Sequence, residues 1–405
     1  MSDISLCGGV RLFGEIEPGG SKNAALPIIF ATLATKGVSR LRGVSDIGDV
    51  RVAIEIIEAF GAKVKRCGSV LEINTTDLHY AEVDKSITSK IRASSYLIGS
   101  CIARFGRFHL SEFGGCNFCN RPIDMHIYAA EMLGAEISDG EIHANRLRGT
   151  KIIFDKKSVG ATINSILMAL YADGITELVG TAKEPHVKSL VDFLVSAGAD
   201  IEETDAGYLV RRSDLHGGNL KIIPDMIEAG TYLLLAPLTD GRITVKNSAS
   251  LELESFFEPL DLSGVSIEYN GKDVTAYGVP EHPITVRTAP HPGYPTDLQP
   301  QIAPLMAKYF GGKIYENVWQ SRFSYLDSLG RFGVRYEIHG NTSNIFKSSL
   351  NAAESYAADL RGGAAAVMCA LAADGESKIK NAELIMRGYS SFEYKLKKLG
   401  AKILN

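Results

Sequence analysis

The most unusual stretch of the sequence is residues 114–124, which read Gly-Gly-Cys-Asn-Phe-Cys-Asn-Arg-Pro-Ile-Asp. Paired glycines, a thiol and an Arg-Pro step predict a loop that leads into a helix. Arg121 follows Cys116 by five residues, and a nearby cation favours the reactive thiolate form of a cysteine. The pattern indicates a reactive thiol, and an ordinary loop cysteine is the alternative.

The Cys-x-x-Cys spacing of Cys116 and Cys119 also fits zinc binding or dithiol redox chemistry. A structural zinc ion needs four ligands, and the sequence offers no second cysteine pair and no close histidine pair. A redox pair normally opens a helix in a thioredoxin-like unit, which disagrees with the internal repeat described below. We therefore expect no metal and no cofactor.

Several predicted helices begin with residues that suit anions. Helix N-termini expose unpaired N–H groups and the positive end of the helix dipole. Serine and aspartate at these positions are equally explained as ordinary N-caps. The helix-start residues are Lys22 and Asn23, Arg92, Ser158 with Val159 and Gly160, Asp297, and Asp359 with Arg361.

A proline-rich run, residues 287–297, delivers the carboxylate of Asp297 to a predicted helix start. This carboxylate is either an N-cap or a general base directed into a cleft. Isolated arginines usually pair with surface acids. Together, however, five cations would neutralise a small, highly charged anion such as a phosphorylated acid: Lys22, Arg121, Arg322, Arg361 and Arg387.

Composition limits the classes of function. The chain has 405 residues, 45% of them hydrophobic, and 43 Lys+Arg against 47 Asp+Glu give a net charge of −4. This balance provides no global field for nucleic acid or anionic lipid. No apolar stretch reaches the roughly 20 residues of a membrane span, and the N-terminus lacks a secretory pattern. With six scattered cysteines, we expect a cytoplasmic protein with reduced thiols and leave protein partners open.

A sixfold internal repeat positions these residues. A helical stretch that ends in Gly-Ala or Gly-Val before a strand-like run recurs at six glycines: Gly61, Gly134, Gly198, Gly264, Gly333 and Gly400. A second glycine precedes each of them, at Gly37, Gly106, Gly174, Gly241, Gly312 and Gly375. Both sets of glycines recur at similar spacings along the whole chain. This agreement indicates six copies of one structural unit.

Each copy reads as a βαβαββ-like unit with an apolar first helix and an amphipathic second helix. A solenoid is the competing architecture, but its units are usually shorter and need polar capping repeats. Six such units exceed one core, so we expect three per domain. The expected domains are residues 21–223, which carry the Cys116 loop, and residues 1–20 with 224–405, a discontinuous domain.

The chain resembles the enolpyruvyl transferases over essentially its whole length. The residues that carry the resemblance are 20–27, 91–94, 114–116 with 121–126, 158–162, 288–299 and 359–361. The resemblance implies a fold of two inside-out α/β domains, each of three repeats, with the active site in the interdomain cleft. It implies no metal requirement.

Within this family the chain is most similar to the branch whose acceptor is UDP-N-acetylglucosamine. The resemblance implies transfer of the enolpyruvyl group of phosphoenolpyruvate to the 3′-hydroxyl, with release of phosphate, as the first committed step of peptidoglycan synthesis. Cys116 would protonate the methylene carbon, and fosfomycin would alkylate its thiol. Asp297 would deprotonate the attacking hydroxyl.

The resemblance also implies the binding residues. Lys22, Arg121 and Arg387 would hold the phosphate of the donor, and Arg322 and Arg361 its carboxylate. The residues implied for the acceptor are Asn23 for the sugar, Arg121, Pro122, Ile123, Asp124 and Met125 for the uracil, Ser158, Val159 and Gly160 for the diphosphate, and Arg92 and Lys156 as further contacts.

The sequence also departs from the family pattern. Leu384-Ile385-Met386 replaces the usual His-Ile-Asp before Arg387, and Met226 stands where an arginine is usual. Two alternatives follow from these departures. One is a diverged transferase with another acceptor, such as shikimate 3-phosphate or another nucleotide. The other is a catalytically silent protein that binds a sugar nucleotide.

Overall fold

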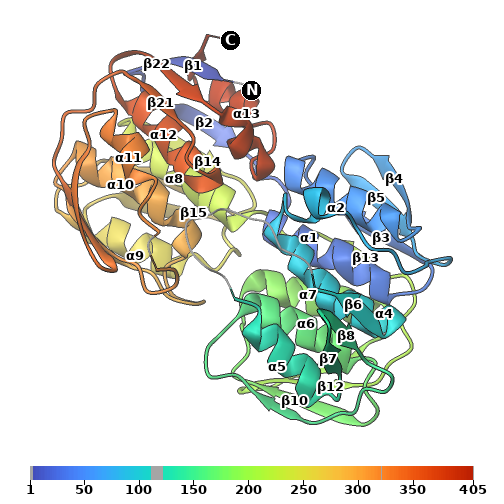
Figure 1. The fold of residues 1–405 in the computed structure, drawn as a ribbon. Helices are drawn as coiled ribbons and strands as arrows, with labels where there is room; N and C mark the ends of the chain where they lie inside the picture. Colours follow the sequence, from blue (N-terminus) through green and yellow to red (C-terminus); the bar gives the residue numbers. More distant parts are fainter. Residues whose placement is uncertain (1–2, 111–121, 321, 405) are drawn as a thin grey trace. The chain divides into compact units, whose positions relative to one another are not determined.

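The computed structural model describes residues 3–110, 122–320 and 322–404, which form two compact α/β units (Figure 1). The described residues of 1–19 and 224–405 form one unit, called the split unit below. Those of 20–223 form the other, called the inserted unit. Each unit has its own hydrophobic core. Cys116, Cys119 and Arg121 lie outside the described residues.

Three four-stranded sheets enclose the described part of the split unit. Their strand orders are β2-β14-β16-β15, β17-β18-β20-β19 and β21-β22-β1-β23. The strands are β1 (Ile4–Gly8), β2 (Phe13–Ile16), β14 (Arg242–Val245), β15 (Ser266–Asn270), β16 (Asp273–Tyr277), β17 (Ile284–Arg287), β18 (Gly312–Tyr315), β19 (Arg335–His339), β20 (Thr342–Phe346), β21 (Glu354–Tyr356), β22 (Gly375–Lys380) and β23 (Lys402–Ile403).

The core of the split unit is helical. Helices α8 (Met226–Leu238), α10 (Gln299–Lys308) and α12 (Leu360–Ala372) pack against one another, and almost all of their residues are buried. A short turn, η3 (Thr296–Leu298), leads into α10. The outer helical elements are α9 (Glu254–Leu262), α11 (Leu326–Gly330), η4 (Ala382–Arg387) and α13 (Phe392–Lys398). Because these apolar inner helices have no solvent face, they form the centre and the sheets cover them.

The inserted unit repeats this plan. Its sheets have the orders β13-β3-β5-β4, β11-β12-β10-β9 and, with three strands, β6-β8-β7. The strands are β3 (Val38–Arg42), β4 (Lys63–Cys67), β5 (Val70–Asn74), β6 (Arg107–His109), β7 (Glu136–Ser138), β8 (Glu141–His143), β9 (Lys151–Ile153), β10 (Ile175–Val179), β11 (Asp200–Glu203), β12 (Gly207–Arg211) and β13 (Asn219–Lys221).

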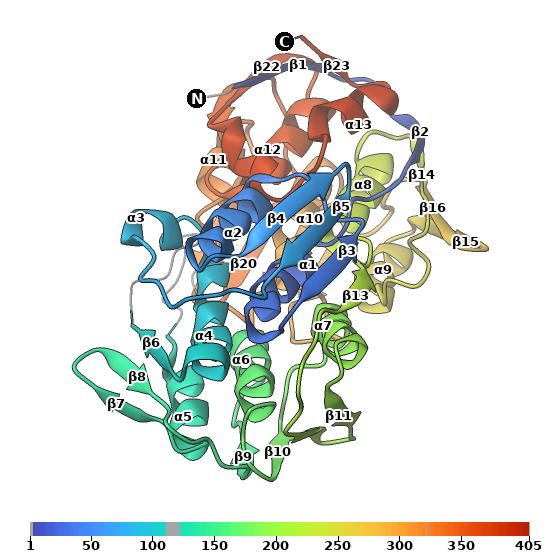
Figure 2. The same cartoon turned by 90° about the vertical axis from the view of Figure 1, so that its right-hand side faces the viewer.

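Its inner helices are α1 (Lys22–Ala31), α4 (Leu97–Phe105) and α6 (Val159–Ala169), and α4 packs closely on α6 (Figure 2). The outer helices are α2 (Gly48–Ala59), α3 (Lys85–Thr88), α5 (Asp124–Met132) and α7 (Pro185–Ser196). Two short turns complete the helical elements, η1 (Thr32–Ala34) after α1 and η2 (Arg92–Tyr96) before α4. In β3 buried and exposed residues alternate, as expected for a sheet with one solvent-exposed face.

The six glycines at the ends of the second helices share one backbone conformation. Gly61, Gly134, Gly198, Gly264, Gly333 and Gly400 all have φ between 89° and 99°. A residue with a Cβ atom is strained there, so glycine ends the helix and turns the chain into the next strand. The repeat read from the sequence is therefore a repeat of helix C-termini in the structure.

The unit β9-α6-β10-α7-β11-β12 shows the complete repeat. In its sheet β9 and β10 pair in parallel, and the remaining pairs are antiparallel. The predicted two-domain α/β architecture is confirmed. Within the described ranges, every helix falls short of the length and apolar character that crossing a bilayer requires.

Candidate functional site

Asp297 and two buried arginines form a charged cluster in the split unit. The Oδ1 atom of Asp297 accepts a hydrogen bond from Nη2 of Arg322 at 2.8 Å. Its Oδ2 atom accepts from Nε and Nη2 of Arg361 at 3.3 and 3.2 Å. The arginine side chains are only 6% and 4% exposed, whereas that of Asp297 is 29% exposed. Two poorly hydrated guanidinium groups therefore surround one more accessible carboxylate.

The cluster lies where the inner helices begin. Asp297 is in η3 ahead of α10, and Arg361 is in the first turn of α12. The caps that precede η3 and α10 are Pro295 and Leu298, so the N-cap alternative for Asp297 does not hold. Asp359, in contrast, caps α12 by accepting from the backbone N–H of Arg361 at 2.8 Å.

Arg361 is held by groups from several elements. Burial opposes its charge, but Tyr389 and the carboxylates of Asp297 and Asp225 outweigh burial and raise the pKa of the guanidinium. Its Cζ atom lies 5.3 Å from the ring centroid of Tyr389. The hydroxyl of Tyr389 is also hydrogen-bonded to this guanidinium.

Lys22 and Asn23 open α1 in the inserted unit, behind the N-cap Ser21. The Nζ atom of Lys22 lies 3.2 Å from Oδ2 of Asp49 in α2, and the Asp49 side chain is almost fully buried. Asp49 was not predictable from the sequence, because no local signal indicates that α2 brings an acid to this helix start. The lysine side chain therefore lies against α2 rather than extending into solvent.

Three predicted acceptor-binding segments meet at His126 in α5. The charges of Arg92 and Asp124 both affect the pKa of the His126 ring. A Cβ atom built on Gly160 would lie 2.8 Å from the Cε1 atom of this ring. Burial, helped by Arg92, lowers the pKa of His126 to about 4. The Nδ2 atom of Asn164 lies 2.6 Å from Nδ1 of this ring. Since an amide nitrogen donates, Nδ1 accepts and the imidazole is neutral.

His126 was part of the sequence motif but had been given no role. Its burial beside the N-terminus of α6 was the property that sequence reasoning could not supply. Ser158 caps α6 through the backbone N–H of Ala161 at 3.3 Å, which confirms the capping alternative for this serine. Val159 and Gly160 follow it in the first turn and are half-buried.

The remaining predicted residues are less closely grouped. Pro122 and Lys156 are exposed, whereas Ile123 and Met125 are half-buried and pack against the core of the inserted unit. Arg387 ends η4 and is half-buried. Cys116 and Arg121 cannot be placed, since they lie outside the described residues.

The departures from the family pattern are accommodated by packing. Met226 is the first residue of α8, and Leu384 and Met386 are in η4. All three are partly buried and pack against the core of the split unit. Apolar side chains at these positions therefore contribute to the core of this protein.

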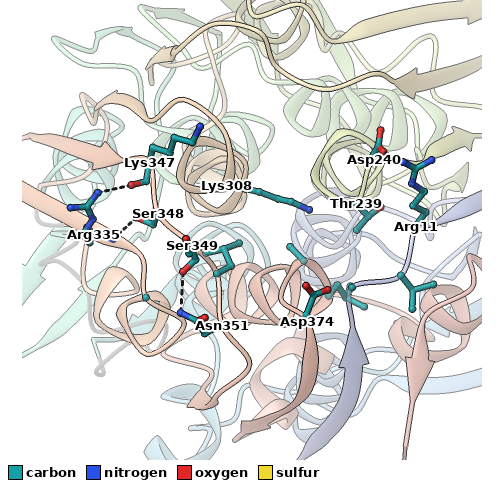
Figure 3. A pocket seen from close by; sticks show the side chains of 16 residues that line it. Arg11, Thr239, Asp240, Lys308, Arg335, Lys347, Ser348, Ser349, Asn351 and Asp374 are labelled. Carbon is teal, nitrogen blue, oxygen red and sulfur yellow. Dashed lines mark hydrogen bonds and ion pairs between the residues drawn. The ribbon is translucent and has the colours of Figure 1, made fainter.

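A polar cavity of about 750 Å³ lies at the other ends of the same inner helices (Figure 3). Thr239, Lys308 and Ala372 contribute to its wall, and they mark the C-terminal ends of α8, α10 and α12. Figure 3 shows Lys308 extended along this cavity, where its Nζ atom donates to the carbonyl of Leu238 at 2.8 Å. None of the residues predicted from the sequence lines it.

The chain belongs to the EPSP synthase family of enolpyruvyl transferases. The family model described as EPSP synthase (3-phosphoshikimate 1-carboxyvinyltransferase) matches residues 6–396. The sequence is 40% identical to UDP-N-acetylglucosamine 1-carboxyvinyltransferase 2 of Clostridium acetobutylicum, over 100% of this chain and 99% of that protein. It is 39% identical to UDP-N-acetylglucosamine 1-carboxyvinyltransferase of Halothermothrix orenii, over 100% and 99%.

Solved structures share the fold. The enolpyruvyl transferase NikO from Streptomyces tendae superposes with a TM-score of 0.88 at 26% identity, over 99% of this chain and 98% of that one. EPSP synthase from Acinetobacter baumannii has a TM-score of 0.75 at 15% identity, with complete coverage of both chains. The second likeness concerns the fold alone.

Proposed function

We propose that this protein transfers the enolpyruvyl group of phosphoenolpyruvate to the 3′-hydroxyl of UDP-N-acetylglucosamine and releases phosphate. The observation that carries the proposal is the Asp297–Arg322–Arg361 cluster, which combines an accessible carboxylate with two buried guanidinium groups. Full-length identity of about 40% to transferases of this name supports the choice of acceptor. The proposed reaction is the first committed step of peptidoglycan synthesis, in the cytoplasm.

The reaction is an addition followed by an elimination. The 3′-oxygen of the acceptor bonds to C2 of phosphoenolpyruvate, while C3 gains a proton and the hydroxyl loses one. The resulting tetrahedral ketal then loses a proton from C3 and phosphate from C2, which restores the double bond. Charge develops on a compact intermediate, so fixed cations stabilise it most strongly where water is scarce.

Arg322 and Arg361 are proposed to bind the carboxylate of the donor. Guanidinium groups bind carboxylates through paired N–H donors, and burial strengthens the interaction. In the structure the carboxylate of Asp297 takes this place. The donor would compete with Asp297 for the two arginines.

This competition would also prepare Asp297 for catalysis. A carboxylate paired with two guanidinium groups is a weak base, because both charges stabilise its ionised form. Once the arginines bind the donor, Asp297 would become a stronger base and would accept the proton of the 3′-hydroxyl. Donor binding would thereby precede activation of the acceptor.

The other predicted residues complete the proposal. Lys22, Arg121 and Arg387 would hold the phosphate, and Cys116 would deliver the proton to C3. The residues around His126 would bind the nucleotide, with the diphosphate at the start of α6.

Phosphate release from phosphoenolpyruvate tests the proposal, with UDP-N-acetylglucosamine and shikimate 3-phosphate as alternative acceptors. We expect release with the sugar nucleotide only. An Arg361→Lys variant keeps the charge but loses the paired donors, so activity should fall at least about tenfold. Lys347→Ala, in the separate cavity of Figure 3, is the matched control. Release with shikimate 3-phosphate alone, or with neither acceptor, would refute the proposal.

A further inference from the structure

A buried carboxylate, Glu316, lies next to the charged cluster. It follows β18 and is only 2% exposed. Its Oε1 atom accepts from the hydroxyl of Thr288 and from the backbone N–H groups of Val318 and Trp319, each at 2.9 Å. Its Oε2 atom accepts from the hydroxyl of Thr296 at 2.9 Å. Four neutral donors thus surround this carboxylate.

Thr296 connects this carboxylate to Arg322. The Nη1 atom of Arg322 donates to Oγ1 of Thr296 at 2.9 Å, while its Nη2 atom donates to Asp297 at 2.8 Å. The direction of these bonds is fixed by chemistry. A carboxylate accepts only and a guanidinium donates only, so the single proton of the Thr296 hydroxyl must point toward Glu316. The lone pairs of that hydroxyl then face the arginine.

We propose that Glu316 is a positioning residue, which orients the Thr296 hydroxyl and thereby holds the guanidinium of Arg322 in place for the donor carboxylate. This inference rests on the proposed function. The chain of contacts Glu316–Thr296–Arg322–Asp297 joins the segment after β18 to the start of α10. Both Nη atoms of Arg322 are hydrogen-bonded in this chain of contacts. The guanidinium is therefore already oriented before phosphoenolpyruvate binds.

The Glu316→Gln variant distinguishes the positioning of Arg322 from stabilisation of the turn that includes Val318 and Trp319. An amide oxygen can still accept from Thr288, Val318 and Trp319. The amide nitrogen then faces Thr296 and donates to it, which leaves the hydroxyl proton of Thr296 without an acceptor. The turn is retained, but the contact to Arg322 is disturbed.

We expect Glu316→Gln to raise the KM for phosphoenolpyruvate about tenfold, the size expected for one hydrogen bond to a charged group. The KM for the acceptor and kcat should change less than about threefold. Thr296→Val should reproduce this effect, and Thr296→Ser should rescue it. Because both variants break the same chain of contacts, the double variant should be no worse than either alone.

Thr288→Val is the matched control. The hydroxyl of Thr288 also donates to Glu316, but it lies outside the chain of contacts to Arg322. This variant should lower the midpoint of thermal unfolding and leave the KM for phosphoenolpyruvate near that of the unchanged protein. Equal effects of Thr288→Val and Thr296→Val on this KM would overturn the inference. So would effects of Glu316→Gln and Thr296→Val that multiply in the double variant.

A thermal-unfolding cycle with Glu316→Gln, Thr296→Val and the double variant requires no activity. Non-additive shifts of the midpoint support the chain of contacts, and additive shifts overturn it. If the unchanged protein releases no phosphate, the proposed function and the role of Glu316 toward the donor both fail, and this cycle still tests the contact between Glu316 and Thr296.

Discussion

The carboxylate of Asp297 lies 3.2 Å from Nη2 of Arg361, a residue 64 positions later in the chain. The pair joins η3 to the first turn of α12 within one unit. It places an internal carboxylate where the carboxylate of the donor is proposed to bind.

Asp297→Asn tests this competition. The amide carries no negative charge, so it holds the two guanidinium groups less firmly. We expect tighter binding of phosphoenolpyruvate by calorimetry, together with a loss in kcat of about 10²- to 10⁴-fold for a missing general base. Asp240→Asn, in the separate cavity, is the control. Weaker donor binding in Asp297→Asn would show that the aspartate assists the arginines rather than competing with the donor.

His126 predicts a pH dependence of stability in the inserted unit. Burial lowers its pKa from 6.5 to about 4, so the unfolded chain takes up a proton in a range where the folded one does not. The contribution of neutral His126 is therefore complete above pH 6.5 and is lost as the pH falls toward about 4. The full loss is about 3 kcal/mol.

His126→Asn should flatten the dependence of the unfolding midpoint on pH in that range, although it is less stable at neutral pH. The exposed His79 provides the control, since His79→Asn should leave the profile unchanged. An identical profile for His126→Asn would mean that other groups titrate there.

A buried ion pair, Glu228 with Lys395, predicts a large stability effect. Oε1 of Glu228 lies 2.5 Å from Nζ of Lys395, and the side chains are 2% and 13% exposed. The N–H of Gly19 donates to the other oxygen at 2.8 Å. Lys395→Met leaves a buried carboxylate without its cation, which should cost about 3–5 kcal/mol in the free energy of unfolding.

Adding Glu228→Gln to Lys395→Met should recover part of this loss, because the uncompensated charge disappears. Lys397→Met on the exposed face of α13 should change stability by less than about 0.5 kcal/mol. Denaturant unfolding measures all three. Equal losses for the two lysine variants would contradict the prediction.

We predict that the thiol of Cys116 is alkylated selectively. From the resemblance, the thiol should open the epoxide of fosfomycin, so that a carbon–sulfur bond forms as a carbon–oxygen bond breaks. Intact-protein and peptide mass spectrometry should find one adduct, at Cys116. Cys116→Ser should abolish it. Labelling at Cys119 instead would contradict the roles assigned to these cysteines.

The repeat was predictable from the sequence because its signals are local. Helix-ending glycines such as Gly198 act on their own backbone, and their φ angles agree with that role. Turn residues behave similarly. Asp139 and Gly140 join β7 to β8 with positive φ at both positions, as a two-residue hairpin requires.

The partners of the candidate site were not predictable in the same way. The sequence indicated Lys22 and Arg322, but not the groups that hold them. Asp49 and Thr296 reach these cations through packing between separate elements. Glu316 gave no signal at all, since one acid after a strand is usually solvated. Only its burial identifies it.

The pairing of β1 with β22 and β23 has a consequence for synthesis on the ribosome. Leu6 pairs with Ile403, so β1 must wait for a strand that lies far later in the chain before its sheet is complete. The chain segment 20–223 carries all the strands of its own sheets, so it can fold earlier during translation. Until β22 and β23 have been synthesised, β1 lacks both of its partner strands, and an unpaired strand edge favours aggregation.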